Sequence, residues 1–198
     1  MSASEQRWAV VDVETSGTDP DRDRVISIAA LTLAPDGTVE GTLSTLLNPG
    51  IANTGPADIH GITADMLTGQ PSFGAIVGQL SQLLRGRTLV AHNAAFDYAF
   101  LAAEAKRANS TLPVETVMCT VALARRLNLP TENVKLASLA RFWGVAQARP
   151  HDAADDALVL AKVLRHALTY AHHHDIALPL CSPRSLRPPV FNSIHRAA

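Results

Sequence analysis

The sequence has few cysteines, no excess of either charge and no long apolar run. Two of its 198 residues are cysteine, and they lie far apart, at Cys119 and Cys181. This number excludes a disulfide framework and a cysteine-based zinc site, and it is compatible with a reducing compartment. The formal net charge of -1 gives no overall attraction to nucleic acid or to an anionic membrane. Any polyanion must therefore be held by local groups or by a metal ion.

Membrane insertion and secretion find no support in the sequence either. No stretch approaches the roughly 18 consecutive apolar residues that a membrane-spanning helix needs. The first eight residues, MSASEQRW, lack the apolar core of a signal peptide. We therefore expect a cytoplasmic protein without membrane contacts.

The composition that is present belongs to a folded domain. Hydrophobic residues make up 47% of the chain and charged residues 18%, which excludes general disorder. The length fits one domain with a full core. We expect this domain over residues 1–175 and an irregular tail over residues 176–198. Four prolines lie in that tail: Pro179, Pro183, Pro188 and Pro189.

Hydrophobic periodicity and turn residues predict the order of the strands and helices. Apolar runs predict strands over residues 8–11, 24–33, 39–47, 87–91 and 114–118. Helical spacing predicts a short helix after Thr63 and longer helices over residues 72–84, 94–107, 120–127, 136–143 and 152–172. Three antiparallel N-terminal strands followed by alternating helices and strands predict an α/β fold with a mixed central sheet flanked by helices.

The most informative stretch is WAVVDVETSG, over residues 8–17. Asp12 and Glu14 are two residues apart at the end of a strand, so their carboxylates point to the same face. No lysine or arginine lies between Arg7 and Arg22 to neutralise them. Carboxylate oxygens suit Mg²⁺ or Mn²⁺, so the pair indicates a metal site. Two solvated acids at a strand end are the alternative interpretation of so short a motif.

Three further polar residues lie at the ends of predicted elements. Asp97 falls in the first turn of the helix over residues 94–107, where the helix dipole also favours an acid. His151 precedes Asp156 by five residues at the start of the last helix, and Pro150 marks a loop in which His151 stays accessible. An α/β sheet brings such ends to one edge. We therefore expect the four acids and His151 to converge.

Three segments in this order resemble the exonuclease motifs of the DEDDh family, the DnaQ-like 3′-to-5′ exonucleases: VVDVETSG, HNAAFDYAFL and HDAADDA. The segment IHGIT, over residues 59–63, is similar to a further family segment. The resemblance covers roughly residues 7–172 and implies a ribonuclease-H-like fold. The spacing H-x-A-x-x-D-A selects Asp156 and not Asp155 as the ligand, and His151 indicates the histidine subclass.

The resemblance also implies a metal-dependent hydrolysis. Two divalent cations, Mg²⁺ or Mn²⁺, would lie roughly 3.5 to 4 Å apart and neutralise the attacking and leaving oxygens. Asp12 would bridge both ions. Glu14 and Asp156 would complete the sphere of one ion, and Asp97 that of the other. His151 would accept a proton from the attacking water, because the ordinary histidine pKa of roughly 6.5 suits this role at neutral pH.

Contacts with the substrate are expected in or beside the same motifs. The backbone next to Glu14 is where the family holds the terminal nucleotide. His60 and Phe96 are candidates for stacking on the last bases, and a core position is an equally good interpretation of Phe96. Asn93 either contacts the substrate or only caps the helix that follows. The complete set of substrate-binding candidates is Thr15, Ser16, Gly17, His60, Asn93 and Phe96.

The function that the resemblance implies is release of nucleoside monophosphates from the 3′ ends of DNA. The role would be proofreading, repair or degradation, as in proteins similar to the epsilon subunit of DNA polymerase III. The motifs do not separate DNA from RNA, so an exoribonuclease that trims oligonucleotides is the second interpretation. The third is an inactive subunit associated with a DNA polymerase, and the full set of catalytic residues argues against it. The expected partners are single-stranded DNA 3′ ends, RNA in the second interpretation, and a DNA polymerase in a proofreading role.

Overall fold

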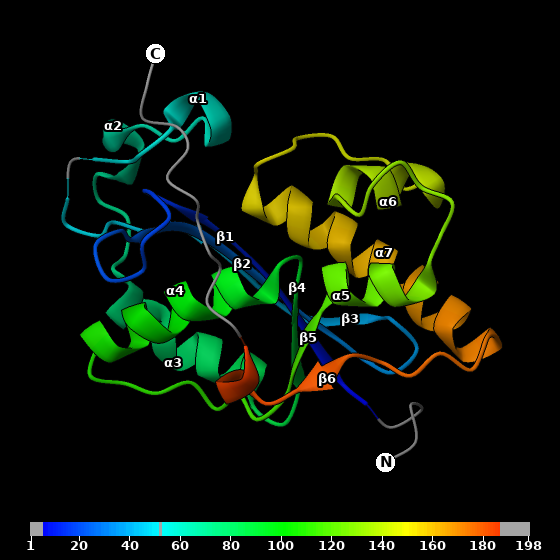
Figure 1. Ribbon diagram of the computed structural model, residues 1–198. Coiled ribbons are helices and arrows are strands. Elements are labelled where there is room, and N and C mark those ends of the chain that lie inside the picture. The colour runs from blue at the N-terminus through cyan, green and yellow to red at the C-terminus, as the bar shows by residue number, and fades with distance from the viewer. Residues whose placement is uncertain (1–5, 52, 187–198) are drawn as a thin grey trace.

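The computed structural model describes residues 6–51 and 53–186, and a six-stranded mixed sheet forms its centre (Figure 1). The strand order is β3-β2-β1-β4-β5-β6. The strands are β1 (Trp8–Thr15), β2 (Val25–Leu33), β3 (Val39–Leu46), β4 (Thr88–Ala91), β5 (Val117–Cys119) and β6 (Leu180–Cys181).

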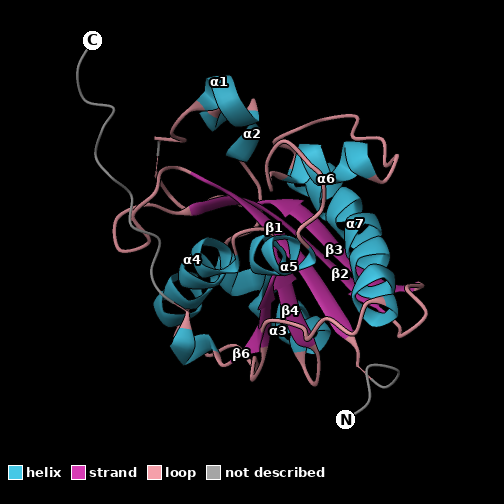
Figure 2. Cartoon of the chain, turned by 45° about the vertical axis from the view of Figure 1, so that its right-hand side comes forward, coloured by secondary structure: helices cyan, strands magenta, loops and turns pink. Residues whose placement is uncertain are grey.

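Helices cover both faces of this sheet. The longer ones are α3 (Phe73–Leu84), α4 (Ala94–Arg107), α5 (Thr120–Leu127), α6 (Leu136–Phe142) and α7 (Ala153–His173). Two single-turn helices, α1 (Ala57–His60) and α2 (Ala64–Leu67), lie beyond one end of the sheet (Figure 2). A short 3-10 helix, η2 (Pro183–Ser185), follows β6.

The first three strands are antiparallel, and β4 and β5 continue the sheet in parallel with β1. In the pairing of β1 with β2, Asp12 lies opposite Ala29 and Glu14 lies opposite Ser27. This arrangement confirms the expected α/β fold with three antiparallel N-terminal strands.

The alternation of side chains along β1 divides the core into two layers. Trp8 and Val10 pack with α5, α6 and α7 on one face of the sheet. Ala9, Val11 and Val13 pack with α3 and α4 on the other face. Asp12 and Glu14 continue the row of Trp8 and Val10, because side chains two apart share a face.

Three local predictions differ from the structure. β1 continues to Thr15 and not only to Val11, because its polar residues still pair with β2. The strand expected over residues 114–118 is β5, which begins at Val117. Residues 180–181 belong to the tail that the sequence predicts to be irregular, but they pair with β5 as β6. The rest of the expected tail, residues 187–198, lies outside the described part of the chain.

None of the helices within residues 6–51 and 53–186 combines the length and the apolar character needed to cross a bilayer.

Candidate active site

The first two acids of the site lie on the last half of β1. Val11 and Val13 are buried on the face of the sheet that packs against α3 and α4. Asp12 and Glu14 alternate with them along the strand, so they point to the opposite face. Both acids are half-buried. The strand thus places two carboxylates together where the hydrophobic row of Trp8 and Val10 ends.

Asp97 enters the site from the first turn of α4. Its side chain is only 4% exposed. The backbone amide of Val13 is close enough to lower its pKa, which places this carboxyl against β1. Asp97 therefore approaches Asp12 from the second layer of helices.

The segment before α7 supplies His151 and Asp156. His151 has a φ of 64°, a backbone conformation that few residues other than glycine adopt. Its backbone amide donates a hydrogen bond to Oδ2 of Asp156, at 3.0 Å. Gln147 donates to the other oxygen, Oδ1, at 2.6 Å. These two bonds fix the orientation of the Asp156 carboxylate.

Asp152 and Asp155 hold the same segment in place. The Asp152 side chain caps α7 by accepting a hydrogen bond from the backbone amide of Asp155, at 3.0 Å. The Asp155 carboxylate accepts bonds from the amides of Ala148 and Arg149, at 3.0 and 2.8 Å. Asp155 thus orders the loop before His151, whereas Asp156 points to Glu14.

The acids of the site raise one another's pKa. Burial is the largest cause of the raised pKa of Asp12, and the neighbouring carboxyl groups of Asp97, Asp156 and Glu14 add to it. Burial, then the charge of Asp156, raises the pKa of Glu14 from the ordinary 4.5 to about 7.

The other two carboxyl groups change in the same direction. Burial raises the pKa of Asp97, and burial outweighs the hydrogen bonds from Gln147 and His151 to raise that of Asp156. Within residues 6–51 and 53–186, none of these four carboxyl groups forms an ion pair with lysine or arginine. Among the described residues, the positive charge that acts on these acids therefore comes from His151, which lowers the pKa of Asp156, and not from a lysine or arginine ion pair.

Three of these residues form a group that could hold a metal ion. Donor atoms of Glu14, His151 and Asp156 all lie within 4.8 Å of one another. Asp12 and Asp97 are not in this group, but each lies close enough to the other acids to change a pKa. A set dominated by carboxylate oxygens suits hard divalent cations such as Mg²⁺ and Mn²⁺. The residues present thus fit the cations that the sequence indicates.

The end of β1 and the turn that follows it hold the first three substrate-binding candidates. Thr15 and Ser16 are buried, at 8% and 4% exposed, and Gly17 is half-buried. The Thr15 hydroxyl donates to the Gly17 carbonyl at 2.6 Å. A Cβ on Gly17 would displace the Asp23 carboxylate, which accepts a hydrogen bond from the Asp19 amide at 2.9 Å. This backbone is closely packed next to Glu14.

His60 lies in α1 and uses both ring nitrogens within its own loop. Nδ1 accepts a hydrogen bond from the Ile62 amide at 3.0 Å, so Nε2 carries the proton and donates to the Thr54 carbonyl at 3.1 Å. Its pKa is lowered mainly by burial and, in part, by the charge of His151. His60 therefore lies near His151, with only its ring faces free of these bonds.

Asn93 and Phe96 differ from one another in their surroundings. Asn93 occupies the position before α4 with a φ of 79°, but its side chain makes no capping hydrogen bond. The prediction that Asn93 caps this helix is therefore confirmed by its position, and its backbone carbonyl accepts a hydrogen bond from the Phe96 amide at 2.8 Å. Phe96 is half-buried, packs against the core and lies 4.8 Å from the Phe100 ring centre. Its surroundings favour the core interpretation.

Sequence reasoning missed the residues that support the site from a distance. Gln147 lies nine positions before Asp156 in an irregular loop, so no periodic pattern connects them. Arg24 and Glu104 form an ion pair across 80 positions of the chain. The sequence contains one relevant signal: Glu104 shares a helical face with Phe100 and Leu101, and an acid on such an apolar face needs a partner.

The comparison with protein families fits this geometry. The model of the exonuclease family RNase_T matches residues 9–164, a range that includes all four acids and His151. The chain belongs to the DnaQ-like, DEDDh-type 3′-to-5′ exonuclease family. It is accordingly an exonuclease, a phosphodiester hydrolase.

Individual relatives differ in how much of their own length aligns with this chain. The DNA polymerase III subunit epsilon of Treponema pallidum is 36% identical over 171 residues, which cover 84% of this chain and 77% of that protein. The PolC-type DNA polymerase III of Clostridium perfringens is 33% identical over 162 residues, which cover 81% of this chain and 11% of that protein. This exonuclease chain thus spans less than a third of the length of several curated relatives.

A solved structure of exonuclease X in complex with 5′ overhanging duplex DNA is similar to this fold. The TM-score is 0.67 at 26% identity, over 83% of this chain and 93% of that chain. The sheet and its flanking helices are therefore those of a known exonuclease fold.

Proposed function

We propose that this exonuclease removes nucleoside monophosphates from the 3′ ends of DNA with two divalent cations and His151 as general base. One observation carries the proposal: four carboxyl groups with raised pKa values and one histidine surround the end of β1 without an ion-pair partner among the described residues. Like charges in a partly buried site are unfavourable unless a cation or a proton neutralises them.

The four carboxylates would hold the cations. Glu14 and Asp156 would hold one ion, Asp97 would hold the other, and Asp12 would contribute to both. When bound, two Mg²⁺ or Mn²⁺ ions stabilise the charge on the attacking and leaving oxygens of the phosphodiester. Gln147 and the His151 amide keep the Asp156 carboxylate in the orientation that this role needs.

His151 accepts the proton of the attacking water. Its side chain is exposed at the start of α7 and lies within 4.8 Å of donor atoms of Glu14 and Asp156. The bond from its backbone amide to Asp156 ties the position of the imidazole to the carboxylate site. His151 can thus reach both the solvent and the reacting phosphate.

The choice of DNA rests on the relatives. Exonuclease X was solved with a DNA duplex, and the Treponema pallidum relative is named as a subunit of DNA polymerase III. A DNA polymerase is accordingly the partner that we propose for a proofreading role. Thr15, Ser16 and Gly17 would hold the terminal nucleotide through their backbone, with the ring of His60 against a base.

The test is hydrolysis of matched single-stranded DNA and RNA labelled at the 5′ end. The wild-type protein should shorten DNA stepwise from the 3′ end with Mg²⁺ or Mn²⁺ and stop when EDTA is added. Asp12→Asn should lower the rate by about 1000-fold, in the range seen when charge stabilisation in a transition state is removed. Asp175→Asn is the matched control, because Asp175 is exposed after the far end of α7.

Two results would contradict the proposal. Faster removal of nucleotides from RNA than from DNA would replace the DNA substrate with RNA. Equal rates for Asp12→Asn and the wild type would remove β1 from the catalytic site.

A further inference from the structure

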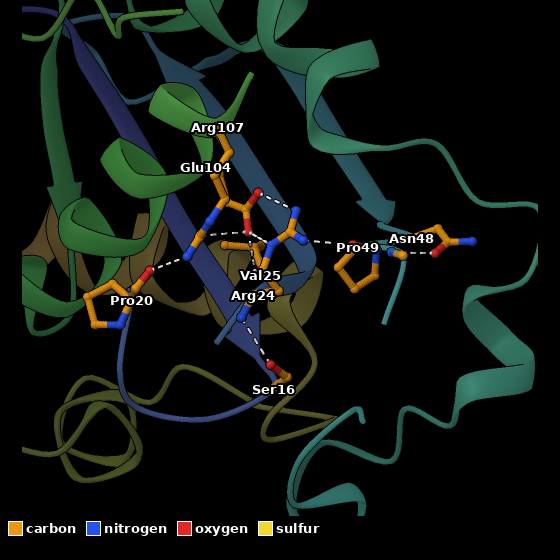
Figure 3. A network of polar contacts seen from close by, with 9 residues as sticks. Ser16, Pro20, Arg24, Val25, Asn48, Pro49, Glu104 and Arg107 are labelled. Carbon is orange, nitrogen blue, oxygen red and sulfur yellow. Dashed lines mark hydrogen bonds and ion pairs between the residues drawn. The ribbon is translucent and has the colours of Figure 1, made fainter. Parts of the chain in front are cut away.

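A buried ion pair connects α4 with the turn after β1 (Figure 3). Glu104 is 1% exposed, and its carboxylate accepts two hydrogen bonds from the Arg24 guanidinium, at 2.6 and 3.0 Å. The bond to Glu104 is the largest cause of the raised pKa of Arg24. Arg107 donates to the same carboxylate at 3.3 Å. One buried acid thus lies between two arginines.

Arg24 also binds the backbone of two segments outside α4. Its backbone amide donates a hydrogen bond to the Ser16 hydroxyl at 3.0 Å. Its backbone carbonyl accepts one from the Ser16 amide at 2.9 Å. Its Nη1 donates to the carbonyl of Pro49 at 2.7 Å. Arg24 therefore joins the turn after β1, the loop after β3 and α4 at one point (Figure 3).

The loop after β3 touches the same turn a second time. A Cβ on Gly55 would collide with the backbone of Ser16, and Gly55 has a φ of 78°. The Gly55 backbone therefore packs directly on Ser16. The loop continues into Thr54 and His60, which are joined by a hydrogen bond. Movement of the turn would consequently move the His60 loop as well.

Glu104 shares a face of α4 with a residue of the active site. Asp97 and Glu104 are seven positions apart, which is two turns of an α-helix, so their side chains point the same way. The ion pair thus links the turn after β1 to the helix that carries Asp97.

We propose that Arg24 and Glu104 are positioning residues for the 3′-terminal nucleotide. They hold the backbone of Ser16 and Gly17 and the His60 loop against α4, in the arrangement that binds the end of the strand. The inference rests on the proposed function, because these two segments contain its substrate-binding residues. The pair itself touches neither the cations nor the reacting phosphate.

A second arginine cluster provides a matched control. Glu40 accepts two hydrogen bonds from Arg7, both at 2.9 Å, and one from Arg87 at 3.1 Å. The cluster has the same composition as that of Glu104, but it lies beside the starts of β1, β3 and β4, at the opposite end of β1 from the acids. Glu40→Gln therefore removes an equivalent charge without touching the turn.

The experiment measures steady-state kinetics on single-stranded DNA with Mg²⁺ for the wild type and for Glu104→Gln, Arg24→Lys and Glu40→Gln. Glu104→Gln should raise KM about tenfold, which is about 1.4 kcal/mol, and change kcat by less than about threefold. Arg24→Lys keeps the charge, but its single nitrogen cannot reproduce the planar guanidinium, which binds Glu104 through Nε and Nη2 and Pro49 through Nη1, so KM should rise less. Glu40→Gln should leave both constants unchanged. Binding of Mn²⁺ alone, measured by calorimetry, should be the same in all four proteins.

The outcomes separate this inference from the proposed function. An unchanged KM in both Glu104→Gln and Arg24→Lys would overturn the inference, and so would a parallel loss of kcat and of Mn²⁺ binding, which indicates general disruption. If Glu104→Gln unfolds at the assay temperature, Arg24→Lys decides alone. If the wild type hydrolyses no DNA, the proposed function fails first, and the inference falls with it.

Discussion

Carboxylates at the two ends of β1 have opposite surroundings. Beside its start, Glu40 lies between Arg7 and Arg87, and hydrogen bonds from these two arginines lower its pKa. At its other end, Asp12 and Glu14 face further acids, and both pKa values are raised. The first cluster is balanced by the chain itself. Within the described residues, the second has no ion pair with lysine or arginine.

Glu104 combines features of both ends. It is buried and close to the turn after β1. Arg24 and Arg107 nevertheless form ion pairs with it, just as a different pair of arginines does with Glu40. Burial alone therefore does not distinguish the acids that we propose as cation ligands. The distinguishing feature is a carboxyl group whose partners are other carboxyl groups. Stability measurements can test this distinction, because the two kinds of acid should respond in opposite directions.

The largest effect on stability should follow loss of the Glu104 charge. Glu104→Gln leaves the Arg24 guanidinium without its buried partner, so we expect a loss of about 3 to 5 kcal/mol in the free energy of unfolding. Glu40→Gln removes an exposed charge and should change the stability little. Urea unfolding of both variants measures the difference. Equal losses in the two variants would mean that the buried cluster of Glu104 contributes no more to the free energy of unfolding than the exposed cluster of Glu40.

The next effect should come from Mg²⁺ itself. A cation that binds only the folded protein stabilises it by about 2.7 kcal/mol at a concentration 100 times its dissociation constant. The wild type and Glu40→Gln should both show this gain in thermal unfolding at pH 8, whereas Asp12→Asn should lose most of it. If Mg²⁺ stabilises Asp12→Asn as much as the wild type, the cation acts elsewhere on the molecule.

The sequence reveals the acids on which these predictions depend, but not the residues that support them. Residues 8–17 reveal β1 and its two acids, because the period of a strand fixes the face of each side chain. The expected helix over residues 94–107 agrees with α4, since its apolar residues repeat over almost four turns. Local pattern thus predicts each long element, although it ends β1 four residues too early.

What the sequence could not reveal depends on contacts between distant segments. β6 has two residues and exists only because β5 offers it a partner. The four residues of α1 follow Pro56 and are too few for a periodic pattern. The bonds of Gln147 to Asp156 and of Arg24 to Glu104 join loop or turn residues to helices, and no spacing rule predicts them. The supporting residues of the site therefore require the fold, whereas its acids do not.

The smallest effect we predict concerns Glu14 and pH in the absence of metal. Its pKa is raised from 4.5 to about 7, so between these values the folded state binds more protons than the unfolded state. This contribution to stability is fully present below pH 4.5 and disappears as the pH rises through 7. Glu14→Gln removes it, so the variant should gain about 1 kcal/mol relative to the wild type between pH 5 and pH 8, after allowance for solvent screening of a half-buried group.

The difference between the two proteins is the quantity to measure. Burial lowers the pKa of His92 to about 4, which destabilises the folded state as the pH falls, but this effect is common to both proteins and cancels. Urea unfolding with EDTA at several pH values gives the two curves. A difference that stays constant with pH would show that Glu14 is already neutralised within the chain, as Glu40 is, and would remove the contrast between the two ends of β1.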